Sequence, residues 1–129
     1  MVQGVNCSND NVLLIRVSKL FRSNMSKDEL YQATRGIWKV GARRNKVDYA
    51  CAVYQGVIQE IYKVERWSKA GTANYDYRDL TALSTLEGRW EFIGKPVKKG
   101  ELMRKRYIGK SVTNLIKQGN QNPIMYVNC

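Results

Sequence analysis

The chain has 129 residues, 43% of them hydrophobic, and carries 22 lysines and arginines against 11 acidic residues, a formal net charge of +11. It contains no histidine, which excludes catalysis through imidazole and metal sites built on histidine. The length suits a single domain, residues 1–129, with a real hydrophobic core. No apolar run approaches the roughly 18 residues needed to cross a bilayer, and the N-terminus lacks the order of a signal peptide. We therefore expect a soluble, cytoplasmic protein without a membrane partner.

The cysteines give no reason to expect a metal or a disulfide framework. Cys7, Cys51 and Cys129 are odd in number, far apart, and form no C-x-x-C pair. Cys51 lies in an apolar run and reads as a small buried residue. We predict no metal and no cofactor.

The first predicted elements are a strand and a helix. Residues 11–18 form a short apolar run rich in β-branched side chains, which is typical of a buried strand. Ser26 and Glu29 then have the spacing of a capping box, which predicts a helix over about 27–35 that ends at Gly36.

A hairpin is the clearest local prediction. Residues 41–48 are a basic connection with room for one helical turn. The apolar segments 49–54 and 57–64 then flank Gln55-Gly56, and a tight turn with Gly56 at positive φ would join them as two strands.

The second half of the chain is less regular. Residues 68–87 are polar without a clear period, and a connection of this length is usually functional or mobile. Further predicted elements are a strand over 88–94 ended by Pro96, a basic helix over 98–107, a shorter helix over 111–117 capped by Ser111 and stopped near Gly119, and a closing strand over 124–127. The order predicts an α+β fold, with a small curved or barrel-like sheet and helices on its rim.

The charge points to a polyanion, because so large an excess repels itself unless a partner or solvent relieves it. Nucleic acid is the first partner to consider, and a free nucleotide follows. The alternative is a basic protein whose charge is spread evenly and has no binding function. Against this alternative, the basic residues cluster in segments 39–46, 63–69 and 95–110.

The tryptophans are the most informative aromatic residues. Trp38, Trp67 and Trp90 each lie within two residues of a cation, and stacking a base on an aromatic ring is worth about 1–3 kcal/mol. Large aromatic residues also fill small cores, so each single tryptophan has a structural alternative. We expect at least one of the three to line a pocket.

A metal-dependent nuclease is a weaker hypothesis. Such an enzyme needs two or three carboxylates that converge on a divalent ion. Glu60 and Glu91 lie on predicted strands, but strand alternation places Lys63 on the face opposite Glu60. Carboxylates in so basic a chain are more often ion-pair partners.

Several segments resemble the PUA-like superfamily, which includes the EVE, ASCH, YTH and SRA domains. They are Thr34-Arg35-Gly36-Ile37-Trp38-Lys39-Val40, Ala52 to Trp67 around the hairpin, Arg89 to Gly94, and Asn122 to Asn128. The resemblance implies a small curved barrel that binds RNA or DNA, in several relatives by holding one modified base in an aromatic pocket. By matched position it implies pocket residues Trp38, Tyr54 and Trp67, and with less force Trp90.

The sequence therefore predicts a non-enzymatic nucleic-acid-binding domain. Arg35 and Asn128 are candidates to read the edge of a stacked base. The predicted phosphate contacts are Lys39, Arg43, Arg44, Lys46, Arg104, Lys105, Arg106 and Lys110. A small-molecule protein that captures a free nucleotide is the alternative from another class, and the nuclease is the third.

Overall fold

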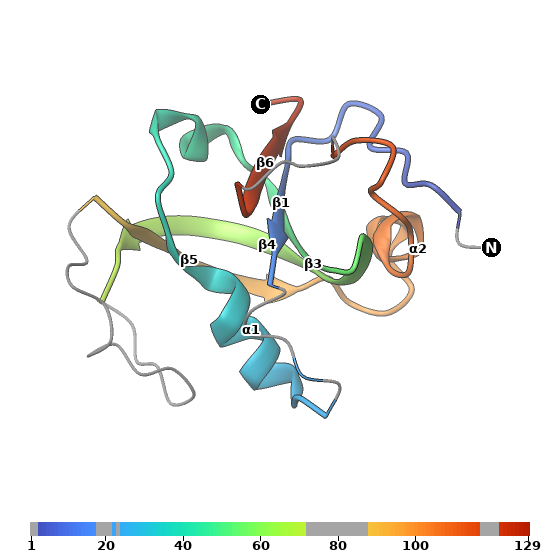
Figure 1. Ribbon diagram of the computed structural model, residues 1–129, viewed down its shortest axis with the longest axis horizontal. Coiled ribbons are helices and arrows are strands. Elements are labelled where there is room, and N and C mark those ends of the chain that lie inside the picture. The colour runs from blue at the N-terminus through green and yellow to red at the C-terminus, as the bar shows by residue number, and fades with distance from the viewer. Residues whose placement is uncertain (1–2, 18–21, 23, 72–87, 117–121) are drawn as a thin grey trace.

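The computed structural model describes residues 3–17, 22, 24–71, 88–116 and 122–129. Within them the chain forms one curled, half-barrel sheet with two α-helices (Figure 1). The elements are β1 (Val12–Arg16), α1 (Lys27–Arg35), β2 (Gly36–Trp38), the 3-10 helix η1 (Ala42–Lys46), β3 (Tyr49–Tyr54), β4 (Val57–Lys69), β5 (Trp90–Pro96), α2 (Leu102–Tyr107) and β6 (Ile124–Val127). The strand order β2-β5-β4-β3-β1-β6 makes β2 and β6 the two edges. The predicted α+β class and curved sheet are confirmed.

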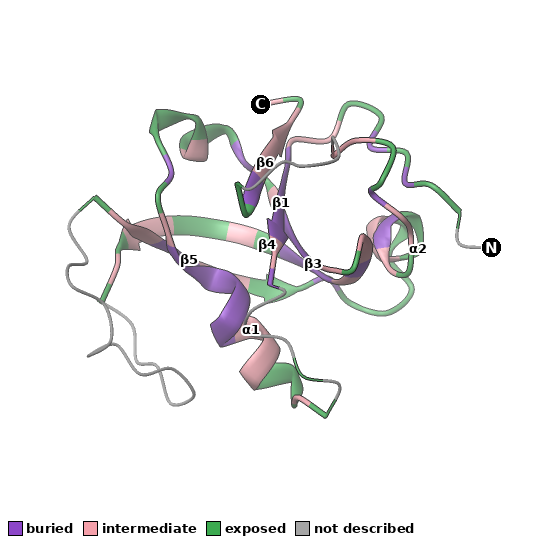
Figure 2. Ribbon diagram, viewed as in Figure 1, coloured by how far each residue is buried: buried purple, intermediate pink, exposed green. Residues whose placement is uncertain are grey.

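The centre of the sheet is buried on both faces. β1 runs parallel to β3, and the side chains of Val12, Leu13, Leu14 and Ile15 are fully buried. A strand covered on both faces reads as a continuous apolar run in the sequence, and this explains the pattern of residues 11–18. Figure 2 shows the buried residues along β1 and β3 and in the C-terminal half of α1.

The hairpin joins β3 to a strand that is longer than predicted. Gln55 and Gly56 have φ values of 49° and 76°, the positive pair that a tight hairpin turn requires, so the prediction at Gly56 is confirmed. β4 pairs with β3 through its first half and with β5 from Tyr62 onwards. The register shifts in both pairings, and such bulges bend a strand, so β4 can carry the curl of the sheet.

The first helix matches its prediction. The Ser26 side chain accepts a hydrogen bond from the Glu29 N–H at 3.1 Å, and the Ser26 N–H donates to the Glu29 carboxylate at 3.4 Å, which completes the capping box. Gly36 ends the helix in an extended conformation and opens β2. β2 is missing from the predicted elements because three residues are too few to show an alternating pattern.

The later helices differ from their predictions. α2 begins only at Leu102, because Gly100 has φ +91° and turns the chain just before it. A helix from 111 is wrong for the described residues 111–116, where a β-bridge at Ser111 is followed by a turn over 113–115 and a bend at 116. The Ser111 backbone forms isolated β-bridges with Gly4 and Val57. The Ser111 hydroxyl accepts a hydrogen bond from the Thr113 N–H and so caps a single turn.

The helices cover opposite faces of the sheet. Leu30 and Tyr31 of α1 pack against the cluster that contains Leu13 and Phe92, whereas Met103 and Tyr107 of α2 belong with the cluster of the other face. The strands predicted over 88–94 and 124–127 are present as β5 and β6, while the polar connection predicted over 68–87 lies outside the described residues from 72 on. Among the described helices, none has the length and apolar character to cross a membrane.

Candidate functional site

The two edges of the curled sheet meet at a hollow of about 430 Å³. The end of β2 supplies one wall and the start of β6 supplies the other. We call this the seam hollow, and the residues that line it are Trp38, Lys39, Arg89, Asn122, Pro123 and Ile124. Its volume lies within the range of roughly 300–1,000 Å³ that is common for ligand pockets.

Two tryptophans stand side by side at the seam. Trp38 of β2 and Trp90 of β5 are direct partners in the antiparallel ladder. The Trp38 indole N–H donates to the Thr34 carbonyl at 2.8 Å, which fixes the ring relative to the end of α1. Both rings are only half-buried, so each keeps surface for a further contact.

The 3-10 helix η1 spans the seam with two consecutive arginines. The Arg43 guanidinium lies 4.4 Å from the ring centroid of Tyr126 in β6, and the Arg44 guanidinium lies 3.6 Å from that of Trp90 in β5. Arg43 also donates from Nε to the main-chain oxygen of Cys129 at 2.9 Å. The predicted turn in the basic connection thus joins the two sides of the half-barrel.

The wall on the β6 side is held by the end of β1. The Arg16 N–H donates to the Pro123 carbonyl at 2.7 Å, and the Arg16 guanidinium donates to the Asn122 carbonyl. The Ile124 N–H donates to the Asn122 side chain at 3.1 Å. These bonds fix the start of β6 opposite Trp38.

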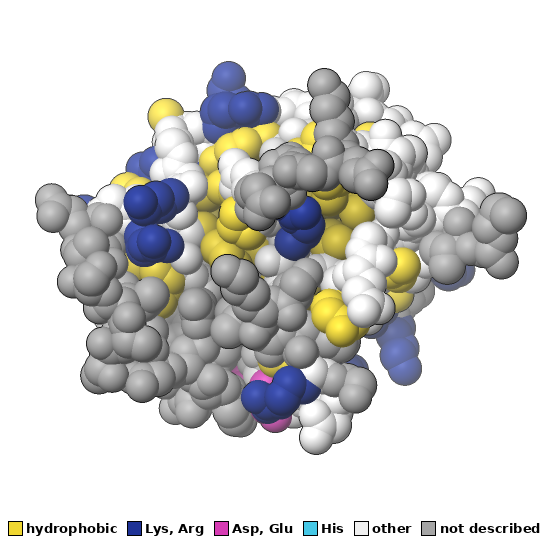
Figure 3. Space-filling model, in the orientation of Figure 1, with side chains coloured by type: hydrophobic (Ala, Val, Ile, Leu, Met, Phe, Trp, Pro, Cys, Tyr) yellow, Lys and Arg dark blue, Asp and Glu magenta, His cyan; other side chains and the backbone are white. Residues whose placement is uncertain are grey.

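The seam is electropositive. Lys39 and Arg89 line the hollow, three further cations lie on η1, and none of the described lining residues is acidic. Figure 3 views the face that carries β6 and η1, and its lysines and arginines lie beside exposed hydrophobic side chains. On the described part of this face, acidic side chains show only at the lower edge, by the start of α1. Burial raises the pKa of Tyr126, against the opposing effect of Arg43, so its hydroxyl stays neutral there.

The third tryptophan belongs to the same face but not to the lining. Trp67 on β4 packs on Phe92 with a centroid distance of 5.5 Å, and its indole N–H is buried without a partner among the described residues. Arg35 is buried at the end of α1, 5.3 Å from the ring of Tyr31. Neither side chain is among the described residues that line the seam hollow.

Tyr54 lies at the other end of the sheet. Its ladder partner is Val57, ten positions before Trp67 on β4, which corresponds to about 33 Å along the strand. The structure therefore does not bring Tyr54 together with Trp38 and Trp67 as the resemblance implies.

Asn128 has a structural task. Its side-chain amide donates to the Ser8 and Asp10 carbonyls, both at 2.9 Å, and its backbone has φ +65°. This clamps the N-terminal turn to the end of β6. Both N–H donors of the Asn128 side chain are therefore engaged within the protein.

The basic residues near α2 form a separate group, on the opposite face from α1. The Arg104 guanidinium donates to the buried Glu60 carboxylate at 2.6 Å and to the Val97 carbonyl at 3.1 Å, so its charge is neutralised inside the protein. Arg106 pairs with Asp10 at 2.9 Å and the Lys110 ammonium donates to the Gln3 side chain at 3.1 Å. Lys105, like Lys39 and Lys46 near the seam, is exposed.

The carboxylates do not converge. Glu60 pairs across the sheet with Ala52, whereas Glu91 lies opposite Ser68, eight positions further along β4 or about 26 Å. The Glu91 side chain is buried and accepts a hydrogen bond from the Gly71 N–H at 2.7 Å. In the part of the chain that the structure describes, no three His, Cys, Asp or Glu side chains are grouped so as to hold a metal ion.

Five contributors to the seam were not in the predicted site: Arg89, Asn122, Pro123 and Ile124 line the hollow, and Tyr126 lies beside Arg43. Arg89 has a sequence signal, since it precedes Trp90, but Tyr126 has none beyond being aromatic. Its role depends on the curl of the sheet, which brings the last strand of the chain close to β2.

Comparison with known proteins gives no matching family model, no matching curated protein and no matching solved structure. The resemblance to PUA-like domains stays a prediction.

Proposed function

We propose that the protein is a nucleic-acid-binding domain that uses the seam to hold one unpaired base and the adjoining phosphates. Trp38, with Trp90 beside it, supplies the stacking surface. Lys39, Arg43, Arg44, Lys46 and Arg89 supply the positive charge. The observation that carries the proposal is that a hollow with Trp38 in its wall and Trp90 beside it meets five cations at the open edge of the sheet.

The stacked arginines support this assignment. A guanidinium held flat on an aromatic ring keeps a fixed orientation and loses little entropy when it binds phosphate or a base. The Nε–H of Arg44 is buried and has no acceptor among the described residues. The Arg44 Nη1 donates to the Gly41 carbonyl at 2.9 Å, so this hydrogen bond and the ring of Trp90 together orient the guanidinium at the seam.

The second candidate function is capture of a free nucleotide. The volume of the seam hollow, about 430 Å³, has room for a single nucleotide and favours this function. The two candidates differ in the number of phosphates contacted. Binding of a nucleic acid releases counterions, with a slope of log K against log salt of about −0.7 per phosphate for a single strand. Capture of a free nucleotide would depend on salt far less and would gain nothing from a longer chain.

The test is fluorescence anisotropy with labelled single-stranded RNA and DNA of mixed sequence, about 12 nucleotides long, over a series of salt concentrations. We expect binding at low salt with a clear negative slope. Absence of binding at low salt, or binding without a slope, contradicts the proposal.

Variants of the seam locate the site. Trp38→Ala removes the stacking surface and is expected to weaken binding by about 1–3 kcal/mol, whereas Trp38→Phe keeps most of it. Lys39→Gln/Arg89→Gln should reduce the slope by about 1.4, the value for two phosphate contacts. The matched control Lys27→Gln/Lys95→Gln removes the same charge from exposed positions outside the hollow lining. Equal effects of the two pairs would place the site elsewhere.

A further inference from the structure

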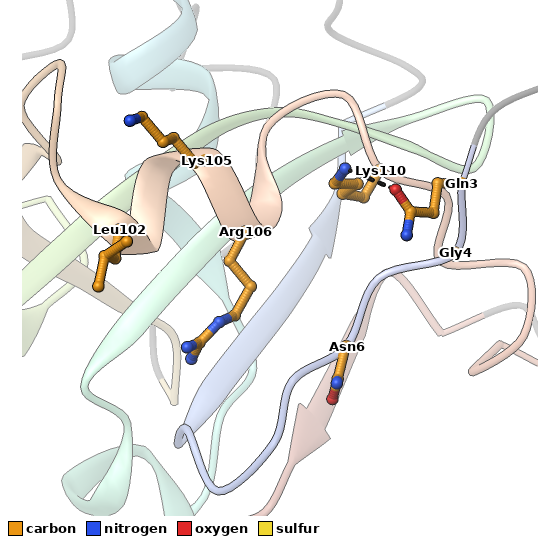
Figure 4. Close-up of a pocket in the computed structure, with 7 residues that line it drawn as sticks. All are labelled: Gln3, Gly4, Asn6, Leu102, Lys105, Arg106 and Lys110. Atoms are coloured by element: carbon orange, nitrogen blue, oxygen red, sulfur yellow. Dashed lines mark hydrogen bonds between the residues drawn. The ribbon is translucent and has the colours of Figure 1, made fainter.

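A second basic hollow lies beside α2 and has a volume of about 330 Å³; we call it the α2 hollow. The N-terminal segment forms one side, and α2 and the loop after it form the other. Figure 4 shows Arg106, Lys110, Gln3 and Asn6 beside the space between the two chain segments, with Lys105 and Leu102 on the far side of α2. Its lining contains three cations, two amide side chains and no described acidic residue: Gln3, Gly4, Asn6, Leu102, Lys105, Arg106 and Lys110.

The backbone frame of this hollow is fixed. The Val5 N–H donates to the Ser111 carbonyl and the Ser111 N–H donates to the Gln3 carbonyl, both at 2.8 Å. The Ile58 N–H donates to the Lys110 carbonyl at 2.9 Å, which ties the loop to the start of β4. Both walls are therefore anchored to the sheet.

Two of the cations are held in place by hydrogen bonds. Lys110 is oriented by Gln3, and the two side chains meet at the edge of the hollow in Figure 4. Arg106 is oriented by Asp10, which also accepts a bond from the Tyr107 hydroxyl at 2.9 Å. Burial and this bond raise the pKa of Tyr107, so the hydroxyl remains a donor to the carboxylate.

The third cation is exposed. Lys105 forms no ion pair among the described residues. Fixed cations beside amide donors are the chemistry that recognises phosphate oxygens.

The two hollows lie at opposite ends of β4. The α2 hollow adjoins Ile58, while Trp90 at the seam pairs with Lys69. The eleven steps between these residues measure about 36 Å along the strand. At about 3.4 Å per stacked nucleotide this equals about 11 nucleotides. One short oligonucleotide cannot reach both hollows, whereas a long one can.

We propose that the α2 hollow is a second phosphate-binding surface, which takes the phosphodiester backbone of the strand whose base is held at the seam. This proposal rests on the proposed function. The domain would then contact one strand at two places. The seam would stack on a base, and the α2 hollow would contact phosphates further along the strand.

The experiment compares labelled oligonucleotides of about 4 and about 24 nucleotides, shorter and longer than the span between the hollows. The variant is Lys105→Gln/Lys110→Gln, and the matched control is again Lys27→Gln/Lys95→Gln. With the long strand we expect the variant to bind about tenfold more weakly at low salt and to lose about 1.4 from the salt slope. With the short strand we expect wild-type affinity.

The outcomes separate the two proposals. If wild type binds the long strand and the variant matches either wild type or the control, the α2 hollow is not a binding surface, while the seam function stands. If the variant loses affinity for the short strand equally, the two hollows are not separate sites. If wild type binds neither strand, the proposed function itself is wrong and this inference falls with it. Circular dichroism checks that each variant is folded.

Discussion

Arg44 and Arg104 look alike in the sequence and do different things in the fold. Both belong to short basic runs on short helices. The Arg44 guanidinium lies over the half-buried ring of Trp90 at the open seam, 3.6 Å from the ring centroid. Arg104 reaches inward to the buried carboxylate of Glu60, and its side chain is only 22% exposed. Arg44 has no acidic partner among the described residues and donates to the Gly41 carbonyl of its own turn, whereas Arg104 neutralises a buried carboxylate.

The contrast shows that the number of lysines and arginines overstates the positive surface available to a polyanion. A guanidinium that neutralises a buried acid adds no field outside the protein, and removing it leaves an uncompensated charge inside. Stacking on an aromatic ring instead orients the cation and keeps its charge at the surface. The predictions below separate these two roles, from the largest expected effect to the smallest.

Arg104→Gln should produce the largest loss of stability. It leaves the buried Glu60 carboxylate without its partner, and breaking a buried pair in this way typically costs about 3 kcal/mol or more. The measurement is urea unfolding of the variant beside wild type. Lys105→Gln is the control, because it removes the same charge from an exposed neighbour.

A double variant shows whether the loss comes from Glu60. Glu60→Leu/Arg104→Met removes both charges, and we expect it to recover much of the stability, because an apolar pair can replace a buried ion pair at little cost. A loss below about 1 kcal/mol in the single variant would mean that the pair behaves as an exposed one.

Asn128→Ala should produce an intermediate effect on stability and none on binding. It removes the two hydrogen bonds to Ser8 and Asp10, each worth about 1 kcal/mol, and places Ala at a positive φ that Asn tolerates better. Asn128→Gly is the control that keeps the backbone conformation accessible. A selective loss of affinity for one base, without loss of stability, would restore Asn128 as a reader of the base edge.

Arg44→Lys should produce the smallest effect, and only on binding. It keeps the charge but loses the planar group over Trp90, a contact worth about 0.5–1 kcal/mol at exposed sites. We expect about threefold weaker binding with an unchanged salt slope. Wild-type affinity would show that the geometry of the stack does not matter, and a change of slope as large as that of Arg44→Gln would show that retaining the charge without the stack is not enough.

The local elements were largely predictable. The Ser26–Glu29 capping box and the Gln55-Gly56 turn are set by chemistry between near neighbours, and both are present. The errors concern short elements. Three-residue β2 shows no period, and Ser111, at the start of the wrongly predicted helix, is held by bridges to Gly4 and Val57, which lie far away in sequence.

The candidate site was predictable only in part. A Trp38 beside a cation is visible in the sequence, and the structure places it in the wall of a hollow. That Tyr54 lies at the far end of β4 follows from strand register, which no single segment encodes. Arg104 pairs with Glu60 only because α2 packs against β4, so the basic run alone does not reveal the role of Arg104.

The sequence by itself determined the large positive charge, the absence of imidazole chemistry, the apolar strands and the caps and turns that bound them. These properties depend on composition or on residues a few positions apart. Only the tertiary structure decided which cations face outward and which aromatic residues meet. The curl of the sheet brings β2 to the start of β6, and from 38 to 124 the chain is too long for local patterns to fix that approach. Trp38, the centre of the predicted site, therefore lies across the hollow from residues 122–124, which are far away in sequence.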